Sequence, residues 1–211
     1  MSIVLYGAQS TASLVVHWLL IELGIAHELR QLDLGRREQK SPEYLALNPQ
    51  GRVPTLLIDG QVLTESVAIA MQLADLHPEA GLAPAPSTPA RGDYYRWMLF
   101  CANTLQPAYR DWFYPQEPAG EANIDAAKAQ ARAKIEAAWQ QVSDHLAAHG
   151  PYLLGQRRSA ADFMLTMLMR WSRHMPRPTD GWPVLAAHAA WMKALPSFAE
   201  TYRREGISDW V

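Results

Sequence analysis

Four prolines lie within a stretch of twelve residues of this 211-residue sequence, and no other feature constrains its fold as strongly. They are Pro78, Pro84, Pro86 and Pro89. Proline fixes φ and lacks a backbone donor, so this stretch favours an extended connector. Strand and helix patterns alternate before it, whereas only helical patterns follow it. We therefore predict a first domain over residues 1–78, a proline-rich linker over 79–90 and an all-helical domain over 91–211.

The first segment predicts a small mixed α/β domain. Asp59-Gly60 is a strong signal for a two-residue hairpin turn, and Ser41-Pro42 for the start of a helix. The expected order is βαβαββα, which joins a parallel βαβ unit to an antiparallel hairpin and places helices on both faces of the sheet. Strands are expected over 3–6, 27–32, 55–58 and 61–64, and helices over 11–23, 42–48 and 66–77.

The second segment predicts helices only. Residues 123–149 are rich in Ala, Lys, Glu and Gln, which are strong helix formers. Pro107 should kink or locally break the first helix of this segment. The helices are expected over 91–114, 123–149, 159–174, 183–194 and 196–205.

Charge and cysteine content exclude several classes of protein. The net charge is −2, whereas a nucleic-acid-binding face needs a strong excess of basic residues. The single cysteine, Cys101, excludes an intramolecular disulfide and a multi-cysteine metal site, and we expect no bound metal. No apolar run approaches the ~20 residues that span a bilayer, and the N-terminus lacks the pattern of a signal peptide. We expect a cytoplasmic protein without membrane or nucleic-acid partners.

Two turns carry polar or constrained residues that suit a bound peptide. Val53-Pro54 follows a glycine-containing turn at the start of a strand, where a cis bond would leave the Val53 N–H and C=O free to pair with an extended ligand. Glu65-Ser66 lies at a strand-to-helix turn, where Ser66 can cap the helix and the positive helix end favours a carboxylate. Glu65 could pair with an ammonium. Taken singly, a trans proline and an ordinary helix cap are the commoner explanations of these two patterns.

A third pattern is the run of hydroxyls Ser10, Thr11 and Ser13 at the start of the first helix. Such hydroxyls are usually caps, but a helix N-terminus is also where a thiolate is stabilised.

In order and spacing, these patterns closely resemble the glutathione-binding half of glutathione transferases. The likeness rests on residues 5–13 (LYGAQSTAS), 44–54 (YLALNPQGRVP), 59–60 (DG) and 63–66 (LTES). The second segment resembles the helical half, with Ser159 to Asp162 similar to the capping box of that family. The resemblance implies a thioredoxin-like first domain, an all-α second domain, glutathione as co-substrate, a homodimer, and transfer of glutathione to an apolar electrophile.

The resemblance also implies roles for single residues. Val53, before a cis Pro54, pairs with the cysteinyl backbone of glutathione, and Glu65 and Ser66 hold its γ-glutamyl end. Lys40 reaches the glycine carboxylate. Gln39 lies beside Lys40, and Arg52 stands where the family often lines the site. Ser10 matches the activating hydroxyl of serine-type members, with Thr11 and Ser13 as rivals. Tyr6 lies inside a strand and is expected to point elsewhere, which argues against a tyrosine-type site.

We expect the electrophile pocket in the helical domain, lined by Tyr109, Trp112, Phe113, Tyr114, Met167, Arg170 and Trp171. For the aromatic cluster, a simple core role is an equal alternative, and for the methionines it is the favoured one. Two other functions stay open: a glutathione-dependent isomerase, dehalogenase or peroxidase, and a non-catalytic binding or regulatory protein on the same scaffold.

Overall fold

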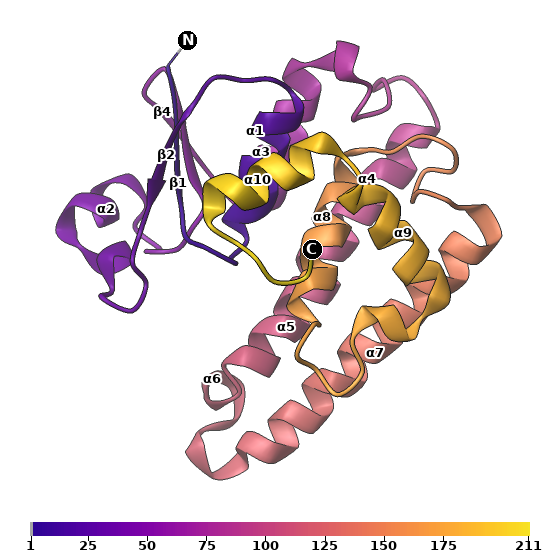
Figure 1. Ribbon diagram of the computed structural model, residues 1–211. Helices are drawn as coiled ribbons and strands as arrows, with labels where there is room; N and C mark the ends of the chain where they lie inside the picture. Colours follow the sequence, from indigo (N-terminus) through magenta and orange to yellow (C-terminus); the bar gives the residue numbers. More distant parts are fainter. Residues whose placement is uncertain (1) are drawn as a thin grey trace. The chain divides into compact units, whose positions relative to one another are not determined.

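Four short strands form one mixed sheet in the order β2-β1-β3-β4 in the computed structural model, which describes residues 2–211 (Figure 1). β1 runs parallel to β2 and antiparallel to β3, and β3 and β4 form the predicted hairpin. Helices α1 and α3 lie on one face of the sheet and α2 on the other (Figure 1). The elements are β1 (Ile3–Gly7), α1 (Ser13–Glu22), β2 (Glu28–Gln31), α2 (Pro42–Leu47), β3 (Thr55–Ile58), β4 (Gln61–Thr64) and α3 (Ser66–Leu76).

Local sequence accounts for two of the turns in this part of the chain. Asp59 and Gly60 have φ of 48° and 85°, and two positive φ values in a row are the mark of the tight hairpin turn predicted from this dipeptide. The Ser41 hydroxyl accepts the Tyr44 N–H at 3.2 Å, and Pro42 is the first residue of α2. Both predictions are confirmed.

The chain divides into two compact units: the part up to Ala83 together with Lys193–Val211, and Pro84–Met192. Helix α10 (Pro196–Glu205) therefore counts with the first unit, where the sequence boundary had assigned it to the second domain. The reason is packing on α1: the Trp18 indole N–H donates to the Ser197 hydroxyl at 2.9 Å. The Trp18 and Phe198 rings also meet edge to face, with centroids 5.2 Å apart.

The second unit is helical, as expected, but its first predicted helix is interrupted. Between α4 and α5 the chain forms a π turn over Cys101–Leu105, and the Gln106 N–H bonds the Cys101 carbonyl five residues back. Pro107 follows at once, and its missing N–H removes one ordinary helical bond. The helices are α4 (Ala90–Phe100), α5 (Gln106–Phe113), α6 (Gln116–Ala119), α7 (Ile124–His149), α8 (Ala160–Trp171) and α9 (Pro183–Lys193). Short 3-10 turns cover Glu38–Lys40, Pro78–Ala80, Glu121–Asn123 and Thr179–Gly181.

The predicted capping box begins α8. The Ser159 N–H donates to Asp162 Oδ2 at 2.7 Å, and the Leu153 N–H donates to Asp162 Oδ1 at 2.9 Å. Burial raises the pKa of Asp162, while its N–H donors and His188, 3.9 Å away, oppose that rise. No helix within residues 2–211 is both long enough and apolar enough to cross a membrane.

Candidate functional site

The register of the sheet brings the three sequence patterns to one end of it. Tyr6 pairs with Thr55, and Thr55 pairs with Thr64. The chain leaves β1 toward the hydroxyl run, enters β3 from the Val53-Pro54 turn, and leaves β4 at Glu65, all beyond this row of paired residues. The loops that carry the predicted glutathione contacts are therefore neighbours in the first unit.

The three rival hydroxyls differ in how the protein uses them. The Thr11 hydroxyl donates to the Ala8 carbonyl at 2.7 Å and lies 2.9 Å from the Ser13 hydroxyl. Ser13 is fully buried, and its oxygen accepts the Ala8 N–H at 3.0 Å. The Ser10 hydroxyl is half-buried and makes no hydrogen bond to any side chain or backbone group within residues 2–211. Ser10 has φ of 63°, in the left-handed region that serine rarely adopts.

The buried Ser13 hydroxyl also explains a glycine at the end of β1. A Cβ on Gly7 would come within 2.7 Å of Ser13 Oγ. Ser13 thus serves as an internal brace of the loop between β1 and α1, with its oxygen enclosed by Gly7 and Ala8.

Tyr6 points away from this loop, as expected. Its hydroxyl accepts from Arg30 Nη1 at 2.7 Å, and the Arg30 guanidinium lies 5.4 Å from the Tyr6 ring centroid. Arg30 belongs to β2, on the edge of the sheet. The Tyr6 hydroxyl is engaged there and does not face the helix start.

The Val53–Pro54 peptide bond is cis, as predicted. The turn before it is held by a network that the sequence reading missed. The Tyr44 hydroxyl and the Asn48 amide both donate to the Arg52 carbonyl, at 2.6 and 2.8 Å. Both side chains also contact the buried Thr55 hydroxyl, at 2.8 and 3.1 Å. The sequence contained one signal for this network. Tyr44 and Asn48 are four residues apart, and residues at that spacing face the same side of a helical turn.

Val53, the residue after Arg52, has a backbone that takes no part in this network. Neither the N–H nor the C=O of Val53 bonds another group within residues 2–211. A backbone donor and acceptor held in place without partners can pair with an extended peptide ligand.

Lys40 and Gln39 come close to the same turn. Lys40 Nζ donates to the Gln50 carbonyl at 2.9 Å. Gly51 is buried with φ of 59°, and a Cβ there would come within 2.6 Å of Lys40 Nζ and 2.7 Å of the Gln39 carbonyl. Glycine at this position thus lets the 38–40 segment lie directly against the turn that precedes Pro54.

The start of α3 departs from the prediction in one respect. Glu65, with φ of 67° and ψ of 106°, is the N-cap, and Ser66 is the first helical residue. The cap residue must have non-helical dihedrals, and Ser66 is already helical, so the expectation that the Ser66 side chain caps the helix is wrong. Ser66 is buried, whereas the Glu65 side chain is exposed. A glutamate at positive φ is strained, and such residues gather at ligand sites.

The predicted pocket residues of the second unit fall into two groups. Tyr109, Met167 and Arg170 are at most 1% exposed, so they pack in the interior of the unit and do not line an open pocket. The Trp139 indole donates to the Tyr109 hydroxyl at 3.0 Å, and burial raises the pKa of that phenol. The expectation for these three is corrected on this ground.

The other pocket candidates are accessible. Phe113 and Tyr114 are 48% and 45% exposed, and Trp112 and Trp171 are half-buried. Phe113 stacks on Tyr109 and meets Trp171 edge on, with centroids 5.9 and 6.2 Å apart. Phe113 and Trp171 both contact the buried Tyr109 and form an apolar surface, whereas the Tyr114 ring lies against the Arg110 guanidinium and the Trp112 ring against the Lys128 ammonium.

The one cysteine of the chain is not a second nucleophile, and residues 2–211 contain no candidate metal site. Cys101 is buried, and burial raises the pKa of its thiol, which keeps it protonated and unreactive. No group of three or more His, Cys, Asp or Glu side chains in the described part of the chain, residues 2–211, could hold a metal ion.

Comparisons with known proteins agree with the geometry. Residues 1–75 match the family "Glutathione S-transferase, N-terminal domain", and residues 125–200 match "Glutathione S-transferase, C-terminal domain". Glutathione S-transferase GST-4.5 of Xanthomonas campestris is 30% identical over 208 residues, which cover 97% of this chain and 99% of that protein. A maleylacetoacetate isomerase of Rhizobium meliloti is 32% identical over 184 residues, 85% of each chain.

A solved structure extends the likeness to three dimensions. The crystal structure of a glutathione transferase homologue from Sulfitobacter, with bound glutathione, superposes with a TM-score of 0.89 at 29% identity and covers 98% of this chain and 99% of that one. Fold, loop placement and full-length similarity thus agree, and the chain belongs to the glutathione S-transferase family.

Proposed function

We propose that this glutathione transferase ionises the thiol of glutathione with the Ser10 hydroxyl and directs the thiolate at an apolar electrophile. One observation carries the assignment to Ser10. Of the three hydroxyls at the start of α1, those of Thr11 and Ser13 are engaged within the loop, and that of Ser10 has no protein partner within residues 2–211. A hydroxyl without a partner can donate to a ligand.

The energy required is within reach of one such donor. A thiol with a pKa of ~8.5 is only a few per cent ionised at neutral pH, and lowering that pKa by about two units requires roughly 2.7 kcal/mol. A hydrogen bond to a charged acceptor supplies ~1.5–3 kcal/mol, and a helix N-terminus adds up to ~1 kcal/mol. The two together suffice.

The glutathione itself would lie across the three loops at the end of the sheet. Val53 offers its unpaired N–H and C=O to the cysteinyl backbone, next to the cis Pro54. Glu65 and the first turn of α3 hold the ammonium and carboxylate of the γ-glutamyl end, with Ser66 as a further donor. Lys40 meets the glycine carboxylate, with Gln39 and Arg52 beside it. The accessible rings Trp112, Phe113, Tyr114 and Trp171 line the surface for the electrophile.

The test is Ser10→Ala, with Thr11→Ala and Ser13→Ala beside it. The pKa of the bound glutathione thiol, followed by thiolate absorbance, should rise by about one to two units in Ser10→Ala only. From a parent thiol pKa of about 6.5, the rate at neutral pH should fall roughly three- to 25-fold and recover at higher pH. Glutathione affinity should hardly change, because the lost bond serves the anion. An unaltered thiol pKa in Ser10→Ala would remove Ser10 from the mechanism, and a shift in either other variant would transfer the role.

A second candidate is glutathione-dependent isomerisation, favoured by the similarity to a maleylacetoacetate isomerase. A panel of aryl halides, epoxides, isothiocyanates, peroxides, haloalkanes and unsaturated acids separates the reactions. Turnover of unsaturated acids without net consumption of glutathione would support isomerisation, whereas consumption with aryl halides or epoxides would support conjugation.

The assembly and its location complete the proposal. A two-fold homodimer is the commonest soluble oligomer, and the exposed Leu76 of α3 and Leu99 of α4 supply apolar surface for it. Sedimentation at micromolar concentration should give twice the mass of one chain; a single-chain mass would contradict the dimer. A chain with one buried cysteine and no possible internal disulfide suits the reducing cytoplasm.

A further inference from the structure

Gln9, the residue before Ser10, is tied to the far end of the sequence. Its amide nitrogen donates to the Glu205 carbonyl at 2.9 Å and to the Gly206 carbonyl at 3.0 Å. A side-chain amide has two N–H donors, so both can be used in this pair of bonds. The two carbonyls close α10, where the last backbone oxygens of a helix have no partner inside it.

The helix that carries these carbonyls is bonded to α1 near both of its ends. The Glu205 carboxylate lies 2.7 Å from His17 Nδ1, and both side chains are at most 1% exposed. At the other end of α10, the Ser197 hydroxyl contacts both Trp18 and Glu22 of α1. The end of α10 is therefore a fixed point within the first unit.

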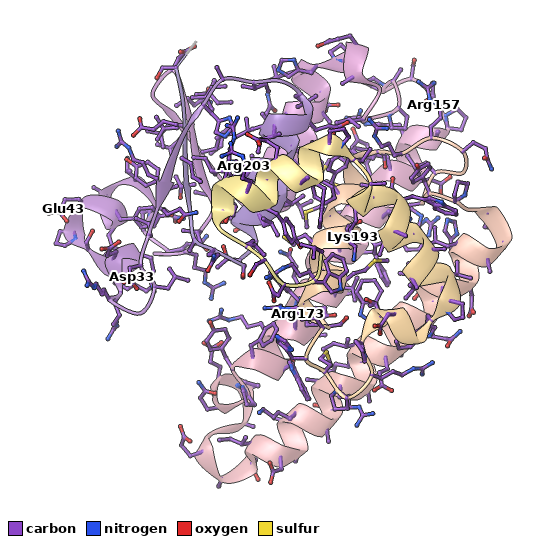
Figure 2. All side chains as sticks on the ribbon, in the orientation of Figure 1. Asp33, Glu43, Arg157, Arg173, Lys193 and Arg203 are labelled. Atoms are coloured by element: carbon purple, nitrogen blue, oxygen red, sulfur yellow. The ribbon has the colours of Figure 1, made fainter. Side chains whose placement is uncertain are left out.

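The outer face of the same helix plays no part in this attachment. Arg203, labelled in Figure 2, and Arg204 are exposed, and both pair with Glu200 at 2.7–2.8 Å. Within residues 2–211, the inner face of α10 contacts α1 through Ser197, Phe198 and Glu205, and the loop before α1 through the Glu205 and Gly206 carbonyls.

Ser10 needs such a hold, because its own backbone does not favour the conformation that it adopts. A non-glycine residue at positive φ is strained, and surrounding contacts must maintain it. The loop is braced at Ala8 by Ser13 and Thr11. Immediately before Ser10, the Gln9 amide supplies two further bonds, to the carbonyls at the end of α10.

We propose that Gln9 is a positioning residue for Ser10: its two bonds to the end of α10 keep Ser10 in the left-handed conformation that aims the hydroxyl at the glutathione sulfur. This inference rests on the proposed role of Ser10. Without the two bonds, the Ser10 backbone relaxes toward negative φ and the hydroxyl leaves the direction of the sulfur.

The test is a double-mutant cycle with Gln9→Met and Ser10→Ala, read as the pKa of the bound glutathione thiol. Methionine keeps the length of glutamine and removes both donors. Gln9→Met should raise the thiol pKa by about half a unit to one unit, which from a parent pKa of about 6.5 lowers the rate at neutral pH roughly 1.5- to threefold, with glutathione affinity within about twofold. In the Ser10→Ala background the same change should add nothing, because residues that act through one another are not additive. Gln9→Ala should repeat the result.

Gln156→Met is the matched control, because Gln156 also donates its amide to a loop carbonyl, that of Gly150, at 3.1 Å in the second unit. It should leave the thiol pKa unchanged. If Ser10→Ala shifts the thiol pKa and Gln9→Met does not, the proposal for Gln9 is overturned while that for Ser10 stands. If Ser10→Ala does not change the thiol pKa, the proposed role of Ser10 is refuted, and the inference about Gln9 that rests on it is refuted with it. A Gln9→Met shift that persists in full beside Ser10→Ala would show that Gln9 acts by another route.

Discussion

Replacing Gly51 by alanine tests how closely the Lys40 segment is built against the turn before Pro54. Gly51 has φ of 59°, and the new Cβ would lie 2.6 Å from Lys40 Nζ and 2.7 Å from the Gln39 carbonyl. The lysine tip can swing aside, but the carbonyl belongs to the backbone and can yield only if the 38–40 turn moves. The substitution therefore displaces the predicted contact to the glycine carboxylate of glutathione.

The magnitude has two parts, and a control separates them. An L-residue in the left-handed region costs about 1–2 kcal/mol, partly offset by about 0.4–1 kcal/mol from the stiffer unfolded chain. Gly24→Ala carries only this part, because φ there is 65° and nothing lies within 4 Å of the new Cβ. Gly51→Ala adds overpacking, typically about 1–3 kcal/mol. We therefore expect Gly51→Ala to lower the free energy of unfolding by about 1–3 kcal/mol more than Gly24→Ala does.

Urea unfolding and glutathione titration of both variants measure these effects. Because Lys40 is exposed, its pairing with a carboxylate is worth up to ~1 kcal/mol, so Gly51→Ala should weaken glutathione binding by up to about fivefold. Gly24→Ala should bind as the parent does. Equal destabilisation of the two variants would refute the crowding argument, and a destabilised Gly51→Ala with intact affinity would separate Lys40 from the site.

Two further predictions concern stability. Tyr44→Phe removes one of the two donors to the Arg52 carbonyl, so urea unfolding should show a loss of about 0.5–1.5 kcal/mol; no loss would mean that Asn48 alone holds the turn. Burial lowers the pKa of His27 below its usual ~6.5, so the unfolded chain takes up the proton first and the free energy of unfolding falls as pH drops below about 6.5. His27→Gln should reduce this fall; an unchanged pH slope in this variant would contradict the assignment.

The first unit was predictable because its signals are local. Asp59-Gly60 specifies its turn by backbone preference, and Ser41-Pro42 specifies the start of α2 by capping and fixed φ. The cis bond before Pro54 could be anticipated from the glycine turn and the strand that follows. In each case the residues that decide the structure are adjacent in sequence.

What the sequence could not supply depends on contacts between distant residues. Gln9 bonds carbonyls 196 and 197 positions away, and no spacing rule links them. An aromatic at 109 or at 113 fits the same helical pattern, yet Tyr109 is buried and Phe113 exposed, since burial is decided by what packs against α5. The strained φ of Glu65, which moves the cap away from Ser66, likewise has no local cause in the sequence.

The division of the chain into units has a consequence for how the protein is made. The first unit holds the beginning of the chain up to Ala83 but also Lys193–Val211, so its two parts leave the ribosome separated by all of Pro84–Met192. At about 5–20 residues per second, the nascent sheet waits roughly 5–20 seconds for α10. Until then His17 and Trp18 of α1 lack their partners Glu205 and Ser197. Completion of the loop that carries Ser10 is thereby coupled to termination of translation, and a chain that stops early lacks the helix that holds this loop.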